Sequence, residues 1–148
     1  MKYLFSLLFL SLFLLEAKEY KAVFDCSSKD MGFVASRMIL VERTMQMIEK
    51  NSDIPKFAIT VHGGCAPIVS KNYDEIILDD KELEHVKRSQ EQLVKLAEKG
   101  VEIVVCAMSL NANTIPKEDV IPSVSISQNS FIDTIGYQNN GYALMTFK

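Results

Sequence analysis

The run from Val101 to Cys106 is the feature that most constrains what this chain can fold into. It follows a helical pattern that ends at Gly100, and it is short, apolar and rich in β-branched residues. Such a run is typical of a strand buried on both faces of a parallel sheet. In an open α/β sheet, ligands and reacting groups lie just beyond the carboxyl ends of these strands. Cys106 therefore lies where a reactive thiol could meet a substrate, and a small buried apolar role is the open alternative.

Strand and helix patterns alternate along the chain, which predicts a mostly parallel sheet with helices on its faces. Candidate helix caps lie within Ser27–Asp30 and at Asp79–Asp80, and a last helix is expected from about Ser130 to Asn140. A single helical turn is expected at Pro116–Val120. The five expected strands are 20–25, 57–61, 101–106, 124–127 and 142–147. With right-handed crossovers these elements predict one three-layer, doubly wound, flavodoxin-like α/β domain.

The first residues resemble a secretory signal peptide. Lys2 precedes an apolar stretch from Leu4 to Leu15, and Ala17 offers a small residue at a cleavage point. The stretch is shorter than the roughly 20 residues that span a membrane. We therefore expect a signal peptide at 1–17, a mature domain at 18–148 and a periplasmic or secreted location, with no membrane association after cleavage.

Composition argues against one large class of partner. The 148 residues carry a net charge of −3 at neutral pH, with no basic tract and no tryptophan. A nucleic-acid binder would show a basic patch or stripe. The sequence thus predicts no nucleic-acid partner.

The cysteine count is odd. The three are Cys26, Cys65 and Cys106, so at least one thiol stays free unless subunits are cross-linked. Export favours an oxidising compartment, where cysteines often pair. The spacing forms no Cys-x-x-Cys redox motif and lacks the close paired ligands of structural zinc sites.

Four side chains fall at the carboxyl ends of the first three expected strands: Cys26, His62, Cys65 and Cys106. In a flavodoxin-like strand order, 2-1-3-4-5, these strands are neighbours about 4.8 Å apart. The four side chains would then gather at one edge of the sheet, with thiols on neighbouring strands within bridging range.

Three chemistries compete for this edge. In the first, Cys106 is a nucleophile that carries sulfur as a persulfide, with its thiolate favoured by turn N–H groups or by His62. In the second, Cys26 and Cys65 form a structural disulfide and leave Cys106 free. In the third, the Cys and His residues bind a metal. Because no ligand spacing supports the third, no metal is expected.

The loop at Ser27–Gly32 occupies the place where a flavodoxin holds its phosphate, since a helix N-terminus with Ser and Lys can bind an anion. It lacks the Thr/Gly pattern of flavin loops. We interpret it as a helix cap and expect no cofactor.

Several segments together resemble the DsrE/DsrF-like family. They are Val61–Gly63, Leu96–Cys106, Ser109–Leu110, Pro116–Val124 and Asn140–Ala143. The resemblance covers essentially the whole mature chain and is densest from Leu96 to Tyr142. Ala107–Met108 departs from the Gly-Asn often found after the family's cysteine.

The resemblance implies a flavodoxin-like α/β sandwich assembled into homotrimers or homohexamers. It also implies a sulfur-relay role in which Cys106 carries the persulfide. From its position at the same edge of the sheet, we expect His62 to be the catalytic companion of Cys106. Gly63, Ser109, Cys65 and Cys26 are the expected pocket residues. The partners would be sulfur donor and acceptor proteins or small sulfur species. The competing hypothesis is a non-catalytic oligomeric module of the periplasm that binds a small ligand or a protein, with Cys106 buried and inert.

Overall fold

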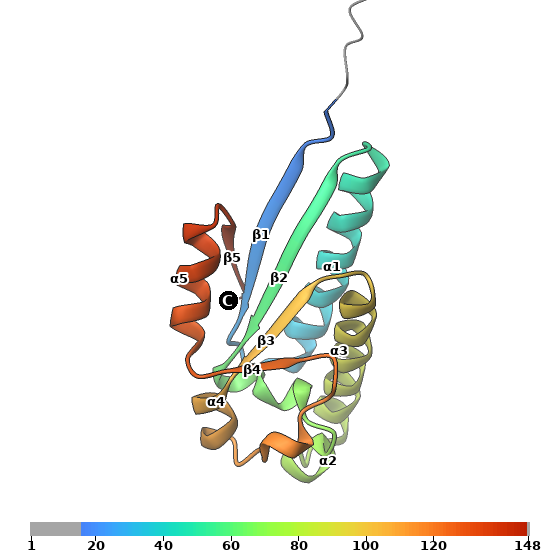
Figure 1. The fold of residues 1–148 in the computed structure, drawn as a ribbon. Helices are drawn as coiled ribbons and strands as arrows, with labels where there is room; N and C mark the ends of the chain where they lie inside the picture. The colour runs from blue at the N-terminus through green and yellow to red at the C-terminus, as the bar shows by residue number, and fades with distance from the viewer. Residues whose placement is uncertain (1–15, 148) are drawn as a thin grey trace, which may run out of the picture.

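The computed structural model describes residues 16–147, and it contains a five-stranded, all-parallel sheet (Figure 1). The strand order is β4-β3-β2-β1-β5. The strands are β1 (Glu19–Cys26), β2 (Ile54–Val61), β3 (Glu102–Cys106), β4 (Ser125–Ser127) and β5 (Ala143–Phe147). Residues 1–15, which make up most of the predicted signal peptide, lie outside the described part of the chain.

Helices cover both faces of the sheet, which confirms the predicted three-layer α/β fold. One face carries α1 (Met31–Lys50) and α3 (Asp80–Glu98), and the opposite face carries α5 (Ser130–Asn139) (Figure 1). Two short helices, α2 (Tyr73–Ile76) and α4 (Ala107–Ala112), lie in the connections. The 3₁₀ segments are η1 (Gly63–Val69) and η2 (Lys117–Asp119).

The assumed strand order 2-1-3-4-5 is wrong. The chain instead moves steadily in one direction from β1 through β2 and β3 to β4, then crosses to the far edge to form β5. Right-handed crossovers that move in one direction place their helices on the same face, and a reversal places the next helix on the other face. This explains why α1 and α3 share a face while α5 covers the opposite one. The first three strands are neighbours in both orders, with β2 in the middle here.

Side-chain caps begin the three long helices, as the sequence predicts for the first two. The Asp30 carboxylate accepts a hydrogen bond from Phe33 N at 2.9 Å, which supports the capping interpretation of the loop before α1. The Asp79 carboxylate accepts from the N–H groups of Lys81 and Glu82 at 3.0 and 2.9 Å. At α5 the cap is Asn129, and the helix begins at Ser130 as expected. Each cap satisfies an N–H group that has no partner within its helix.

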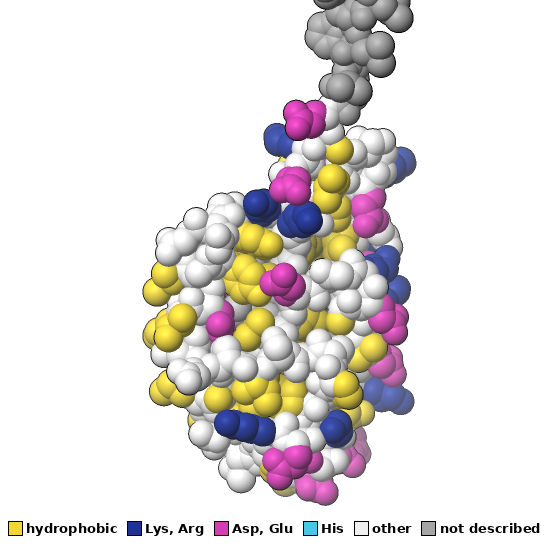
Figure 2. All heavy atoms as spheres, in the orientation of Figure 1, with side chains coloured by type: hydrophobic (Ala, Val, Ile, Leu, Met, Phe, Trp, Pro, Cys, Tyr) yellow, Lys and Arg dark blue, Asp and Glu magenta, His cyan; other side chains and the backbone are white. Residues whose placement is uncertain are grey.

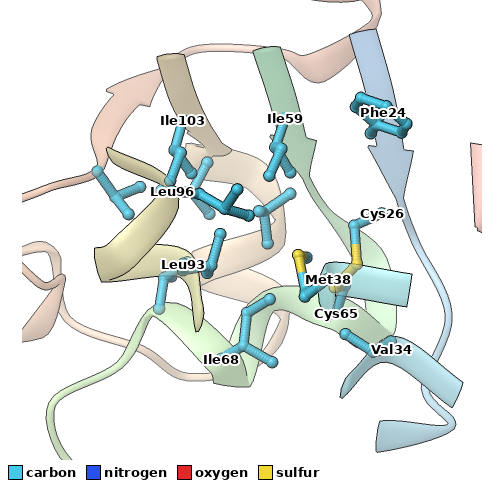
Figure 3. Close-up of a cluster of buried hydrophobic side chains, with 14 of the residues drawn as sticks. Phe24, Cys26, Val34, Met38, Ile59, Cys65, Ile68, Leu93, Leu96 and Ile103 are labelled. Carbon is cyan, nitrogen blue, oxygen red and sulfur yellow. A yellow bond between two sulfur atoms is a disulfide. The ribbon is translucent and has the colours of Figure 1, made fainter. Parts of the chain in front are cut away.

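The main core lies between the sheet and the α1/α3 layer (Figure 3). Strand β2 contributes Ile59, helix α1 contributes Met38, and helix α3 contributes Leu93 and Leu96, each with no more than 3% of its surface exposed. Ile68 of η1 closes the end of this layer. These buried side chains fix how α1 and α3 pack on the sheet.

No helix among residues 16–147 is long and apolar enough to cross a membrane.

A buried carboxylate joins the two helices of this layer. Glu42 of α1 is 7% exposed and accepts hydrogen bonds from Gln92 at 2.7 Å and Lys95 at 3.0 Å. Lys99 lies 3.2 Å from the same carboxylate. The side-chain hydrogen bonds from Gln92 and Lys95 are the main cause that lowers the pKa of Glu42 to about 2, against the opposing effect of burial. The pattern of the sequence did not single out this residue.

We expect Glu42→Gln to destabilise the protein by about 2 kcal/mol at neutral pH. The folded-state pKa lies below the ordinary value of 4.5. The contribution is therefore present above about pH 4.5 and is lost as the pH falls toward 2. Urea unfolding of both proteins between pH 7 and pH 2 measures this. The two stabilities should converge in acid, whereas a difference that does not change with pH would contradict the ionic origin.

Candidate functional site

Strand register places His62 and Cys106 side by side at the carboxyl edge of the sheet. Val61 of β2 is paired with Val105 of β3. The residues that follow this pair are His62, directly after β2, and Cys106, the last residue of β3. Side chains alternate between faces along a strand. His62 and Cys106 therefore share the face that α5 covers, and Asp25, paired with Thr60, shares it too.

The thiol of Cys106 is buried where β3 passes into α4. The residue is 4% exposed, and its Sγ lies 4.0 Å from the carbonyl oxygen of Gln128, just before α5. Burial alone would raise the pKa of this thiol. Backbone N–H groups of Ser130, Ser109 and Met108 and the Ser109 hydroxyl donate to the sulfur, and together they hold the pKa below its ordinary value. These donors favour the thiolate, which is the nucleophilic form.

The start of α4 supplies most of these donors, and the sequence analysis did not predict this helix. Its six residues are too few to show a periodic apolar stripe. Ala, Met and Leu are good helix formers, and they are the available signal that the chain continues as a helix after the strand. The turn N–H groups expected near the sulfur are thus the first N–H groups of a helix, which have no intrahelical partner.

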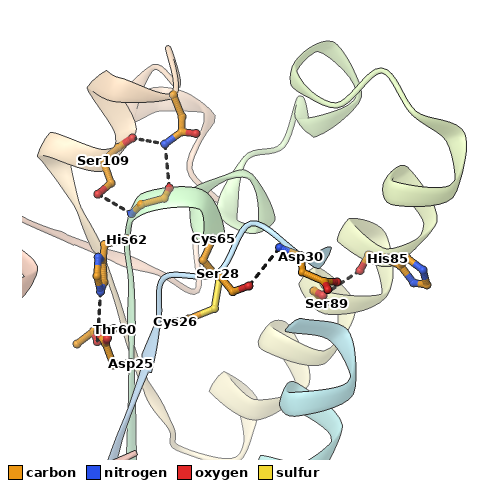
Figure 4. Close-up of a disulfide and its surroundings, with 12 residues drawn as sticks. Asp25, Cys26, Ser28, Asp30, Thr60, His62, Cys65, His85, Ser89 and Ser109 are labelled. Carbon is orange, nitrogen blue, oxygen red and sulfur yellow. Dashed lines mark hydrogen bonds and ion pairs between the residues drawn. A yellow bond between two sulfur atoms is a disulfide. The ribbon is translucent and has the colours of Figure 1, made fainter. Parts of the chain in front are cut away.

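Ser109 is held by the loop after β2. The Gly63 N–H donates to Ser109 Oγ at 2.9 Å, so the hydroxyl proton remains for the sulfur (Figure 4). Asn113 Nδ2 bridges the carbonyl oxygens of Gly63 and Ser109 at 3.0 and 2.8 Å. Gly63 has a φ of +53°, a left-handed conformation that favours glycine. The expected pocket residues Gly63 and Ser109 are therefore brought together beside Cys106.

His62 has a carboxylate partner that the sequence analysis missed. Its Nε2 lies 2.7 Å from Asp25 Oδ1, and Thr60 Oγ1 donates to the same oxygen at 2.9 Å (Figure 4). The hydrogen bond with Asp25 is the largest cause that raises the pKa of His62, against burial, and the charge of Cys106 raises it further. The available signal was a carboxylate directly after the apolar run Ala22–Phe24, one residue before Cys26.

Cys26 and Cys65 form a disulfide, while Cys106 is the free cysteine of the described chain. Both bonded residues are fully buried among α1 side chains such as Val34 and Met38 (Figure 3). Cys26 follows Asp25 directly and so points to the opposite face of the sheet. The four side chains expected at one edge are thus divided: the disulfide lies in the α1/α3 core, and His62 and Cys106 lie on the α5 side.

The disulfide nevertheless joins the two loops that hold the site. The His62 N–H donates to Cys26 O at 2.9 Å, and the Gly64 N–H donates to Ser27 O at 3.2 Å. A Cβ atom on Gly64 would lie 2.6 to 2.9 Å from Lys29, mostly from its backbone, so this position requires glycine. The loops after β1 and β2 are therefore tightly packed against each other.

No group of three or more His, Cys, Asp or Glu side chains within residues 16–147 is arranged to hold a metal ion. The grouping of Cys106, His62 and Asp25 instead has the parts of an activated thiol: a nucleophile, a neighbouring imidazole and a carboxylate that orients the imidazole.

Comparison with known proteins decides the family. The model of the DsrE/DsrF-like family matches residues 21–147, which is nearly all of the described chain. The chain belongs to the DsrE/DsrF-like family. The resemblance predicted from the sequence is thus confirmed.

Two relatives extend this result. An uncharacterized protein of Aquifex aeolicus (strain VF5) is 32% identical over 148 residues, which is 99% of this chain and 64% of that protein. The chain thus spans somewhat under two thirds of the length of this relative. A solved structure, protein MTH1491 of unknown function from Methanobacterium thermoautotrophicum, superposes with a TM-score of 0.67 at 15% identity. The match covers 86% of this chain and 98% of that one, and it supports the fold.

Proposed function

We propose that the protein carries sulfane sulfur as a persulfide on Cys106 and passes it between a donor and an acceptor. The observation that carries this proposal is the buried free thiol surrounded by donated hydrogen bonds, in a family whose better understood members are sulfur-relay proteins. The lowered pKa of Cys106 supports a larger thiolate fraction than an ordinary cysteine has at the same pH. The Asp25–His62 pair beside it supports an imidazole that accepts or returns the thiol proton.

The loading step is an exchange between sulfur atoms. The Cys106 thiolate attacks the outer sulfur of a donor persulfide, polysulfide or thiosulfate, and a new S–S bond forms. The S–S bond of the donor breaks, and its electron pair leaves with the donor thiolate or, for thiosulfate, with sulfite. An acceptor thiolate then attacks the outer sulfur of the persulfide and releases the Cys106 thiolate. No external oxidant is needed, because the transferred sulfur is already at the sulfane level.

Incubation with thiosulfate or polysulfide is expected to add at least one sulfur atom to Cys106. Intact and peptide mass spectrometry measures the gain, and a reductant should remove it. Cys106→Ser keeps nearly the same volume and should show no gain on that peptide. If the Cys106 peptide of the wild type stays unmodified while the protein is native, the carrier proposal fails.

We further propose that the chain is exported and acts in the periplasm or outside the cell. The apolar segment at Leu4–Leu15 supports this proposal. A disulfide between Cys26 and Cys65 fits an oxidising compartment, where such bonds persist. Fractionation of cells that express the full chain, with N-terminal sequencing of the product, tests it: the chain should begin at Lys18.

A homotrimer or homohexamer is the assembly that we propose. Helix α5 buries only Ser130 and exposes Phe131, Ile132 and Ile135 by 58 to 70%. Figure 2 shows hydrophobic side chains on the side of the surface where α5 lies. Apolar surface of this kind marks a site of association. Its position beside Ser130, a donor to the Cys106 sulfur, would place the thiol close to a subunit boundary.

The second candidate is a non-catalytic oligomeric binding module. The 4% exposure of Cys106 favours it, since a sealed thiol meets no substrate. Thiol counting separates the two: one thiol that reacts in the native protein supports sulfur transfer, and a thiol that reacts only after unfolding supports the binding module.

A further inference from the structure

A hollow lies away from Cys106, on the other side of the sheet, and nothing in the sulfur chemistry uses it. It has a volume of about 430 Å³ and lies between α1 and the strands β1 and β5. It exists because α1 and α3 pack over the middle of the sheet and leave the edge strand β5 without a helix on this face. We call it the β5 groove.

Aromatic and aliphatic side chains line most of the β5 groove. Phe24, Phe57 and Phe147 are buried at its base, and the ring of Phe24 lies 5.1 Å from that of Phe57. Leu40 of α1 and Met145 of β5 form its sides and remain 49% and 51% exposed. Ligand sites for small molecules commonly have 300 to 1,000 Å³ of mostly apolar space with a few polar groups. The volume and the lining both fall in that class.

The charged side chains that line the groove are both cations, Lys21 and Arg37, and no acidic side chain lines it within the described chain. Lys21 has a partner, because its Nζ lies 3.7 Å from Glu19. Arg37 makes no ion pair among residues 16–147; its guanidinium lies 4.6 Å from the centre of the Phe33 ring. Arg37 is thus the cation that remains available to an incoming anion.

The α1 residues that line the groove run from Arg37 to Ile48. At 1.5 Å per helical residue this is about 16 Å of length, with the arginine at one end. An elongated apolar molecule with a single anionic head fits such a shape: the carboxylate pairs with Arg37 and the chain lies along the phenylalanines. A guanidinium binds a carboxylate well because it offers two parallel N–H donors.

We propose that the β5 groove binds a medium-chain alkyl carboxylate, with its head at Arg37. This proposal is independent of the persulfide on Cys106. It gives the protein a second site, on the α1 side of the sheet, with a chemistry distinct from that of the thiol.

Decanoate, below its micelle concentration, is the probe. Calorimetric titration of the purified Cys106→Ser protein should show binding in the micromolar range, and the use of this variant keeps the result separate from the sulfur chemistry. Arg37→Gln should weaken binding about tenfold, and decanol should bind equally to both proteins. Leu40→Glu, which places a carboxylate in the groove, should weaken it by more than tenfold.

Met47→Glu is the matched control, because Met47 is 69% exposed on α1 and does not line the groove. It should leave decanoate binding unchanged. Failure of decanoate to bind, or equal loss in the Leu40 and Met47 variants, would overturn the proposal. Light scattering provides the remaining outcome: if Leu40→Glu alone dissociates an oligomer, the groove is an interface between copies, and the ligand site is refuted.

Discussion

Replacement of Ser109 by alanine is expected to slow the alkylation of Cys106 about tenfold at neutral pH. The Ser109 hydroxyl donates to the sulfur, and its own oxygen accepts from Gly63 N. A hydrogen bond to a charged group contributes about 1.5 to 3 kcal/mol, which corresponds to about one to two pKa units. Loss of the hydroxyl therefore raises the pKa of Cys106 and lowers the thiolate fraction. Iodoacetamide kinetics from pH 5 to pH 10 measure the effect.

The pH profile distinguishes this cause from a change in access to the thiol. The wild-type and Ser109→Ala rates should meet at high pH, where both thiols are ionised. Ser109→Thr keeps the hydroxyl and should restore most of the rate. A deficit that persists at pH 10 would instead show that Ser109 acts by shaping the entrance.

His62→Gln should raise the pKa of Cys106, read from the same pH profile of alkylation, by less than Ser109→Ala does. The charge of Cys106 helps to raise the pKa of His62, but the hydrogen bonds to the sulfur come first among the causes that lower the pKa of Cys106. Asp25 Oδ1 lies 2.7 Å from His62 Nε2, so it would offset much of the charge of a protonated imidazole. A larger shift in His62→Gln than in Ser109→Ala would make His62 the main activator of the thiol.

Removal of the disulfide is expected to have the largest effect on stability. The bond closes a loop with a sequence separation of 39 residues, for which the chain-entropy model gives about 4 kcal/mol. The double variant Cys26→Ala/Cys65→Ala should lose about this much in urea unfolding. A reductant should destabilise the wild type and Cys106→Ala to a similar extent, because Cys106 is not part of the bond.

A loss below about 1 kcal/mol would contradict this prediction. It would mean that the backbone hydrogen bonds between the two loops, from His62 N to Cys26 O and from Gly64 N to Ser27 O, already restrain them. The double variant would then serve as a disulfide-free background for thiol assays on Cys106.

Local sequence patterns were enough to find the strands and the long helices. The β-branched run that ends at Cys106 is a strand from Glu102, one residue later than expected. Asp79 caps α3 as predicted, because a cap depends on side-chain and backbone atoms within one turn. Strand β2 begins at Ile54, earlier than the expected Phe57, and includes Pro55. The first residues of β2 are less buried than the rest of the strand, and a proline is tolerated at such a strand start.

The sequence was also enough to predict Cys106 as the candidate thiol, but it was not enough to predict the groups around that thiol. A residue at the end of a buried strand in an α/β sheet is an expected place for chemistry, which is why Cys106 stood out. Asp25 did not stand out, because it lies 37 residues from His62 and meets it only after β1 and β2 pair. The donors at Met108 and Ser130 come from two helices, of which one was not predicted at all.

The sequence by itself determined the α/β class, the family and the residues at the carboxyl ends of the strands, because these follow from local periodicity and from motif order. Only the tertiary structure decided the strand order, the pairing of Cys26 with Cys65 and the partners of Cys106. The physical reason is that successive side chains of a strand point to opposite faces of the sheet, while the order of the strands is set by how the crossovers pack. Adjacent residues such as Asp25 and Cys26 face opposite layers, and what each meets there depends on which elements the crossovers bring to that face.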